Sequence, residues 1–196
     1  MQYFKIKINK FSAQEIGLIV DFLKKGKVIV YPTDTIYGLG CLATDKKAIN
    51  KIYRIKKREK KKPLLVLISD FKMLRKYFKV DKKQLAYLRK IWPGKVSVIL
   101  NKKSNLPGYV SGRLSSVAVR LPKSGFLTKM IKELGAPVVS TSLNKSGRKP
   151  LASVSRLEKY FRAAKPDLVI DAGTIKGRPS KLIDLRDVDK IKILRK

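Results

Sequence analysis

Histidine is absent from this chain of 196 residues, and cysteine occurs once. Without histidine the protein has no Ser-His-Asp or Cys-His nucleophile, no histidine general base and no histidine metal ligand. A single cysteine excludes an internal disulfide and a zinc site with several cysteine ligands. Any catalysis must therefore rely on Lys and Arg electrostatics, carboxylates, hydroxyls and backbone groups.

Long apolar runs are also missing. None approaches the ~20 residues that cross a bilayer, and the N-terminal MQYFKIKINK alternates apolar and cationic residues where a signal peptide would be continuously apolar. An apolar fraction of 44% indicates a globular chain with a real core. We therefore expect one domain over residues 1–196, in the cytoplasm and without contact to a membrane.

Acidic residues are scarce: 14 Asp and Glu stand against 47 Lys and Arg, a formal net charge of +33. Such a field attracts polyanions, among them RNA, DNA and nucleotides. The cations occur in every segment, however, as a lysine bias spread over the surface would also produce. Charge alone does not decide between these readings.

Short β-branched runs alternate with segments of helical period. Strands are predicted at 4–8, 27–31, 64–68, 96–100, 117–121, 137–140, 167–170, 182–185 and 191–194. Helices are predicted to begin after the N-caps Ser12, Thr44, Asp81, Ser124 and Ser155. Several strands are apolar throughout, which predicts an α/β fold with a buried, twisted mixed β-sheet and flanking helices.

Polar side chains follow two of these strands. YPTDTIYGLG (31–40) places Thr33, Asp34 and Thr35 in the turn after a strand, and APVVSTSLNKSG (136–147) runs from a strand into hydroxyl and amide groups. The exit of an apolar strand is where α/β proteins place ligands, and such groups suit phosphate or ribose oxygens. An ordinary turn and a capped loop are the alternatives.

Cations cluster in KKREKKKPL (56–64), which has six of them in nine positions. In a helix Lys56 and Arg58 would lie about 200° apart, whereas in an extended chain they would share one face and could hold a phosphate or carboxylate together. A solvated basic turn is the alternative. Arg120, inside an apolar strand, needs an internal carboxylate or a bound anion unless it faces solvent.

Taken in order, these motifs resemble one family. The motifs are KVIVYPTDTIYGLG, the K-x-R of Lys56 and Arg58 before K-P-L, WPG, SVAVR, the S-x-N of Ser142 and Asn144, and GRPSKLID. Together they make the chain similar to the YrdC-type (TsaC) threonylcarbamoyl-AMP synthases, in their short single-domain form. The resemblance implies a YrdC-like sheet with a concave, positively charged cavity. It also implies a nucleotidyltransferase that makes threonylcarbamoyl-adenylate and pyrophosphate from L-threonine, bicarbonate and ATP, for threonylcarbamoyladenosine modification of tRNA.

The resemblance also implies roles for single residues. Catalytic roles fall on Lys56 and Arg58, threonine contacts on Thr35, Arg120, Ser140 and Ser180, and nucleotide contacts on Arg58, Lys62, Ser116, Ser142, Asn144 and Arg195. No residue is implied as a metal ligand, because Mg²⁺ would be coordinated by the ATP phosphates. The implied partners are tRNA and the threonylcarbamoyl-transferase proteins that use the product.

Three positions depart from the family pattern: Lys62, Leu67 and Lys181 stand where relatives often have Asn, His and Thr. Two other functions remain open. One is a double-stranded RNA or tRNA-binding protein without catalysis. The other is a carbamoyl-transfer module of the hydrogenase-maturation type, although those large chains carry Cys-rich zinc modules and this chain has one cysteine.

Overall fold

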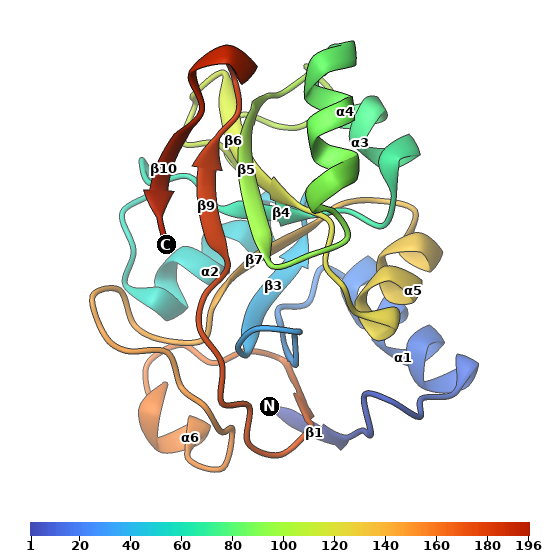
Figure 1. The fold of residues 1–196 in the computed structure, drawn as a ribbon. Helices are drawn as coiled ribbons and strands as arrows, with labels where there is room; N and C mark the ends of the chain where they lie inside the picture. The colour runs from blue at the N-terminus through green and yellow to red at the C-terminus, as the bar shows by residue number, and fades with distance from the viewer.

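The computed structural model describes all 196 residues, with strands and helices mixed along the chain (Figure 1). The strands are β1 (Gln2–Lys5), β2 (Ile29–Tyr31), β3 (Gly38–Leu42), β4 (Leu65–Leu67), β5 (Val96–Asn101), β6 (Ser116–Arg120), β7 (Val138–Ser142), β8 (Leu168–Asp171), β9 (Lys181–Asp184) and β10 (Lys192–Arg195). The helices are α1 (Ala13–Lys24), α2 (Lys46–Lys56), α3 (Phe71–Tyr77), α4 (Lys82–Ile91), α5 (Gly125–Leu134) and α6 (Leu157–Tyr160), with a 3₁₀ turn η1 (Val188–Lys190).

All ten strands form one mixed sheet in the order β1-β8-β2-β3-β7-β4-β6-β5-β9-β10. The pairs β1–β8, β2–β8, β4–β6 and β5–β9 are parallel, and the other five are antiparallel. The predicted α/β class with a mixed sheet is therefore confirmed. The inner strands are nearly continuous runs of buried residues, as expected of a sheet covered on both faces.

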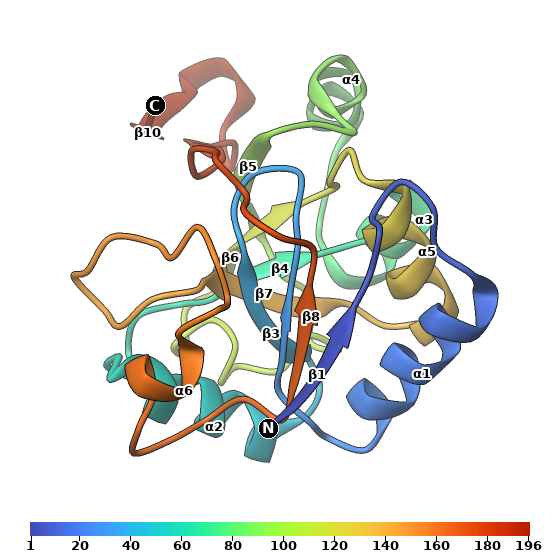
Figure 2. The ribbon, with the colours of Figure 1, turned by 90° about the horizontal axis from the view of Figure 1, so that it is seen from below.

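The helices lie against the sheet on several sides. α1 and α5 pack against each other, and α2 packs on β3. Figures 1 and 2 both show α1 and α5 as neighbours on one flank, with α2 and α6 away from them. None of the helices is long and apolar enough to cross a membrane.

Three of the predicted N-caps are confirmed, and two of these form capping boxes. At α1 the Ser12 hydroxyl accepts the Glu15 N–H at 3.1 Å while the Glu15 carboxylate accepts the Ser12 N–H at 2.6 Å. Asp81 and Gln84 make the same pair of bonds at α4. Ser124 caps α5 by accepting the Leu127 N–H.

Two predicted caps are wrong. α2 is capped by Asp45, not Thr44, because the Asp45 carboxylate accepts the Ala48 N–H at 2.9 Å. α6 begins after Arg156 without a side-chain cap, since the Ser155 N–H donates to Ser153 and turns the chain first. In both places several hydroxyls or carboxylates compete for the role, and spacing alone does not choose between them.

Strand β3 and helix α3 were not predicted. β3 (GLGCL) carries two glycines, which read as a turn, yet it pairs with β2 and β7 along its whole length. The Tyr31 ring lies against this strand: a Cβ on Gly38 would stand 3.0 Å from the ring, and one on Gly40 would meet the ring and the Val139 carbonyl oxygen. Glycine is thus required here by the close approach of a neighbouring ring and backbone, not by a turn.

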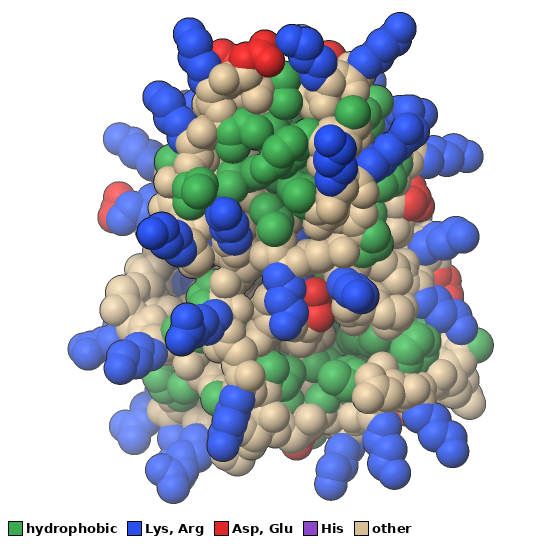
Figure 3. Space-filling view, in the orientation of Figure 1, with side chains coloured by type: hydrophobic (Ala, Val, Ile, Leu, Met, Phe, Trp, Pro, Cys, Tyr) green, Lys and Arg blue, Asp and Glu red, His purple; other side chains and the backbone are tan.

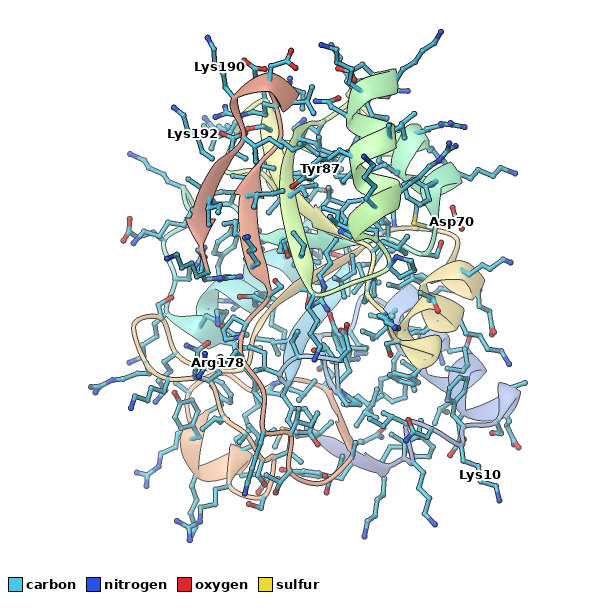
Figure 4. The ribbon with its side chains drawn as sticks, in the orientation of Figure 1. Lys10, Asp70, Tyr87, Arg178, Lys190 and Lys192 are labelled. Carbon is cyan, nitrogen blue, oxygen red and sulfur yellow. The ribbon has the colours of Figure 1, made fainter.

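The lysine and arginine side chains are distributed, not gathered into one patch. Figure 3 shows them over the whole visible face, with few acidic side chains among them. Lys10, Lys190 and Lys192 point away from the ribbon at opposite ends of the molecule in Figure 4. On this face the excess positive charge lies on solvent-exposed lysine and arginine side chains.

Gly40→Ala should lower the free energy of unfolding by about 1–3 kcal/mol, because the added methyl group overpacks the contact with Tyr31 and Val139. Gly125→Ala is the matched control: no atom lies within 4 Å of its Cβ position in the first turn of α5. The control should be neutral or stabilising. Urea denaturation measures both, and equal midpoints for the two variants would contradict the packing argument.

Candidate functional site

A cavity of about 390 Å³ opens on the sheet. Its walls come from strands β3, β4, β5, β6, β7, β9 and β10 and from loops, and no helical residue lines it. Strands β3 and β10 both contribute, although they stand six places apart in the sheet. A flat sheet would separate them by about 28 Å, so their shared contribution to one cavity requires a curved sheet.

The lining combines cations, hydroxyls and an apolar wall. Three guanidinium groups reach it, from Arg58, Arg120 and Arg195, and no Asp or Glu side chain does. The hydroxyl residues are Thr33, Thr35, Tyr37, Ser116, Ser140, Thr141, Ser142 and Ser180, and the apolar wall includes Leu65, Leu67, Ile99, Leu114, Val117 and Leu182. This composition suits a ligand with anionic groups, hydrogen-bonding groups and a flat apolar part.

Arg120 is buried at the cavity and held from three directions. Its Nη2 lies 2.5 Å from both oxygens of Asp34, its Nε donates to the Gly94 carbonyl at 2.8 Å, and its Nη1 donates to Thr35 Oγ1 at 3.3 Å. The counter-ion that an arginine in an apolar strand requires is therefore the internal carboxylate of Asp34. Burial lowers the pKa of Arg120, and Asp34 opposes that shift. The pair is close to neutral as a unit.

The hydroxyl of Thr35 belongs to a hydrogen-bond network with Thr33 and Arg120. Thr33 Oγ1 lies 2.6 Å from the Ile36 carbonyl, so its proton is donated there, and its two lone pairs accept the N–H groups of Thr35 and Ile36 at 3.0 and 3.1 Å. Thr35 Oγ1, 2.9 Å from Thr33 Oγ1, accepts from Arg120 at 3.3 Å. Thr35 therefore presents a hydroxyl to the cavity that can accept from or donate to a ligand.

Arg58 and Arg195 keep donors free. Arg58 bonds only the Pro63 carbonyl, at 3.0 Å, and its Nε has no partner. Arg195 donates from Nε and Nη2 to the Ser180 carbonyl, at 3.0 and 2.7 Å. Neither guanidinium has a carboxylate partner, so both bring uncompensated positive charge to the cavity.

Lys56 lies behind the cavity wall and is 2% exposed. Its Nζ donates to the Ser142 carbonyl at 2.5 Å, the Asn144 carbonyl at 2.9 Å and Asn144 Oδ1 at 2.8 Å. Three acceptors match the three N–H groups of an ammonium. Burial lowers the pKa of Lys56 to about 7, and the charge of Arg58 acts in the same direction.

This lysine therefore connects the K-x-R segment to the S-x-N segment. Ser142 donates its hydroxyl proton to Asn144 Oδ1 at 2.6 Å, and the Asn144 amide donates to the Arg148 carbonyl. The three side chains of Lys56, Ser142 and Asn144 form one network, which we call the lysine clamp. It fixes Arg58 and Ser142 on the same cavity.

With this geometry in place, comparison with known proteins is informative. The Sua5/YciO/YrdC family model, described as "Telomere recombination", matches residues 21–196. The chain belongs to the Sua5/YciO/YrdC family.

Relatives within this family are similar over most of their length. A threonylcarbamoyl-AMP synthase of Serratia proteamaculans is 32% identical, with 89% of this chain and 93% of the relative covered. A putative threonylcarbamoyl-AMP synthase of Methanocaldococcus jannaschii is 35% identical, with 95% and 89% covered. The structure of Pyrococcus abyssi Sua5 complexed with L-threonine superposes with a TM-score of 0.89 at 28% identity. That comparison covers this whole chain but 57% of Sua5, so the chain spans little more than half of that protein.

The structure brings most of the predicted site residues of this family member together. Eight of them line the cavity: Thr35, Arg58, Ser116, Arg120, Ser140, Ser142, Ser180 and Arg195. Lys56 and Asn144 do not line it and meet in the lysine clamp behind it. Lys62 lies outside, with a half-exposed ammonium 2.7 Å from Glu59. Of the two alternatives for residues 56–58, the extended chain is not found, because α2 continues to Lys56 and Lys57 turns left-handed (φ 49°).

Several polar lining residues were not among the predicted ones, including Thr33, Tyr37 and Thr141, and neither were Asp34 and Ser97, which contact lining residues. Asp34 holds Arg120, and the need of a buried arginine for a counter-ion was the signal that could have identified it. Ser97 is fully buried in β5 and its hydroxyl lies 2.7 Å from that of Ser180. Its signal is a serine inside the apolar run VSVIL.

Lys56→Met should lower the free energy of unfolding by about 1–3 kcal/mol, because the buried oxygens of Ser142 and Asn144 lose their donor. Lys60→Met, at an exposed position of the same basic stretch, should change it by less than about 0.5 kcal/mol. Chemical denaturation at neutral pH measures both, and equal effects would contradict the clamp.

The difference in the free energy of unfolding between wild type and Lys56→Met should also increase between pH 7 and pH 10. The pKa of Lys56 is about 7 in the folded protein and near its ordinary value of 10.5 when unfolded. Between these values the unfolded chain binds more protons, so raising the pH favours the folded state. Denaturation at pH 7 and pH 9 tests the sign, and an advantage that shrinks with rising pH would contradict it.

Proposed function

We propose that this protein is a threonylcarbamoyl-AMP synthase, which converts L-threonine, bicarbonate and ATP to threonylcarbamoyl-adenylate and pyrophosphate. Membership of the Sua5/YciO/YrdC family, with relatives named for this activity, supports the proposal. The observation that carries it is that one lining guanidinium, Arg120, is paired with a carboxylate, while Arg58 and Arg195 have none. We infer that these mark a neutral end and a cationic end of the cavity. A zwitterionic amino acid and a polyanionic nucleotide need those two environments.

The neutral end is assigned to threonine. The Arg120–Asp34 pair adds almost no net charge, while Arg120 Nη1 offers a donor and Thr35 Oγ1 a hydroxyl, 3.3 Å from each other. A carboxylate beside an amine presents the complementary acceptor and donor. Ser140 and Ser180 supply further hydroxyls on the same lining.

The cationic end is assigned to ATP. Arg58 and Arg195 have free donors and no carboxylate partner, as contacts to triphosphate oxygens require. Ser142 has already donated its proton to Asn144, so it faces the cavity as an acceptor and suits a ribose hydroxyl. Leu114, Leu182 and Ile99 provide apolar surface for a base. We retain Lys56 and Asn144 as residues that position Arg58 and Ser142.

The reaction suits a site without histidine. The threonine amine forms a bond to the carbon of bicarbonate or its CO₂, and water is lost overall. An oxygen of the resulting carbamate bonds to the α-phosphorus of ATP as the bond to the β-phosphate oxygen breaks and pyrophosphate leaves. All reactants carry negative charge, so the protein's main contribution is to align and neutralise them. Arg58 is the residue best placed to do so.

We do not assign a set of protein ligands to Mg²⁺ at this cavity. The chain has no cluster of three or more potential ligands among Asp, Glu, Cys and His, and both oxygens of Asp34 are engaged by Arg120. We therefore assign Mg²⁺ to the ATP phosphates and no residue to Mg²⁺. The proposal also includes a cytoplasmic location, tRNA as the final acceptor and a separate threonylcarbamoyl-transferase that uses the adenylate.

Purified protein should release pyrophosphate from ATP only when both L-threonine and bicarbonate are present. The assay omits each component in turn and also follows incorporation of labelled threonine into an adenylate. Pyrophosphate release that does not depend on threonine would refute the proposed function.

Arg58→Ala should reduce kcat/KM for ATP by roughly 100-fold, because it removes the unpaired guanidinium at the cationic end of the cavity. Lys60→Ala removes a charge two residues away at an exposed position and should leave kcat/KM within about twofold. Equal losses in both variants would mean that the cations act through their total charge.

A further inference from the structure

Tyr31 carries a polar group for which the folded protein provides no partner. Its side chain is fully buried at the end of β2, and its Oη has no hydrogen bond. Leaving a buried hydroxyl unpaired costs about 1–3 kcal/mol. The ring alone would fill the space against Gly38 and Gly40 equally well, so packing does not explain the hydroxyl.

The phenol lies beneath the threonine end of the cavity. Gly40, which the Tyr31 hydroxyl approaches, is paired across the sheet with Ser140. Directly opposite residues of an antiparallel pair project to the same face, so the Ser140 side chain leaves the sheet beside the Tyr31 hydroxyl. Ser140 and the charge of Arg120 also lower the pKa of Tyr31, against the larger rise that burial causes. Ser140 in turn lines the cavity. One residue therefore separates the unpaired phenol from the ligand space.

The protonation of Tyr31 decides the direction of hydrogen bonding between Tyr31 and Ser140. Burial raises the pKa of Tyr31, so the phenol keeps its proton at physiological pH and is a donor. A serine oxygen that accepts this proton keeps its own O–H free to donate. An anionic oxygen in the cavity would then meet a hydroxyl that already points toward it.

We propose that Tyr31 is a positioning residue: when a ligand occupies the cavity, Tyr31 donates to Ser140 Oγ and thereby directs the Ser140 proton toward a carboxylate or carbamate oxygen of the amino-acid substrate. This inference rests on the proposed synthase function. It assigns to Tyr31 a role that acts through Ser140 and not through contact with substrate.

Tyr31→Phe tests the role, because it removes the hydroxyl and retains the ring. The midpoint of thermal unfolding without ligand should stay the same or rise, since an unpaired buried hydroxyl is lost. The KM for threonine should increase about fivefold, the ratio expected for one neutral hydrogen bond. The KM for ATP should not change. A hydroxyl that serves only the fold would lower the unfolding midpoint when removed and leave both KM values unchanged.

Ser140→Ala provides the coupling test. If Tyr31 acts through Ser140, adding Tyr31→Phe to Ser140→Ala should cause no further rise in the KM for threonine. Tyr109→Phe is the matched control: its hydroxyl donates to the Thr44 carbonyl at 2.6 Å, and Tyr109 does not line the cavity. That variant should lower the unfolding midpoint and leave the KM for threonine unchanged.

The outcomes separate the inference from the function on which it rests. Wild-type protein that releases pyrophosphate with threonine, together with a Tyr31→Phe variant of unchanged KM for threonine, overturns the positioning role alone. A fivefold rise that persists in the Ser140→Ala background also overturns it, because Tyr31 would then act by another route. Wild-type protein without threonine-dependent release overturns both.

Discussion

The site depends on a buried ammonium. Lys56 joins the end of α2 to the end of β7, two segments separated by more than 80 residues, through three hydrogen bonds to Ser142 and Asn144. Removing an ammonium from water costs several kcal/mol, and three well-placed oxygens offset part of that cost, the remainder showing as the lowered pKa of Lys56, about 7. Arg58 and Ser142 face the same cavity because this contact holds their segments together.

The charge at each place in the cavity depends on whether an arginine has a carboxylate partner, more than on how many arginines line the cavity. Arg120 is paired with Asp34, whereas Arg58 and Arg195 bond only uncharged oxygens and have no carboxylate partner. In the proposed function this distinction assigns a zwitterion to Arg120 and a polyphosphate to the two unpaired guanidinium groups, within about 390 Å³. The lysine and arginine side chains on the face that Figure 3 shows are exposed, so solvent and salt screen their charge.

Packing beneath the cavity couples the fold to the site. The Tyr31 ring occupies the space that side chains at Gly38 and Gly40 would need, which brings β3 close to β2 and β7. Strand β7 carries Ser140 and Ser142 into the lining, and β3 carries Gly38 there. Substitutions that disturb this contact are therefore expected to affect stability and ligand binding together.

The fold class, most strands and the polar groups at two strand ends could be predicted from the sequence, because apolar period and strand-end polar groups are local patterns. The resemblance of the ordered motifs to one family also identified eight residues that line the cavity. Which cations of KKREKKKPL reach the site depends on the tertiary structure. α2 persists to Lys56, and the left-handed turn at Lys57 sends Lys56 inward, Arg58 to the cavity and Lys62 to the surface. Likewise β3 and the pairing of Arg120 with Asp34 depend on contacts between distant segments. Local periodicity in the sequence cannot predict such contacts.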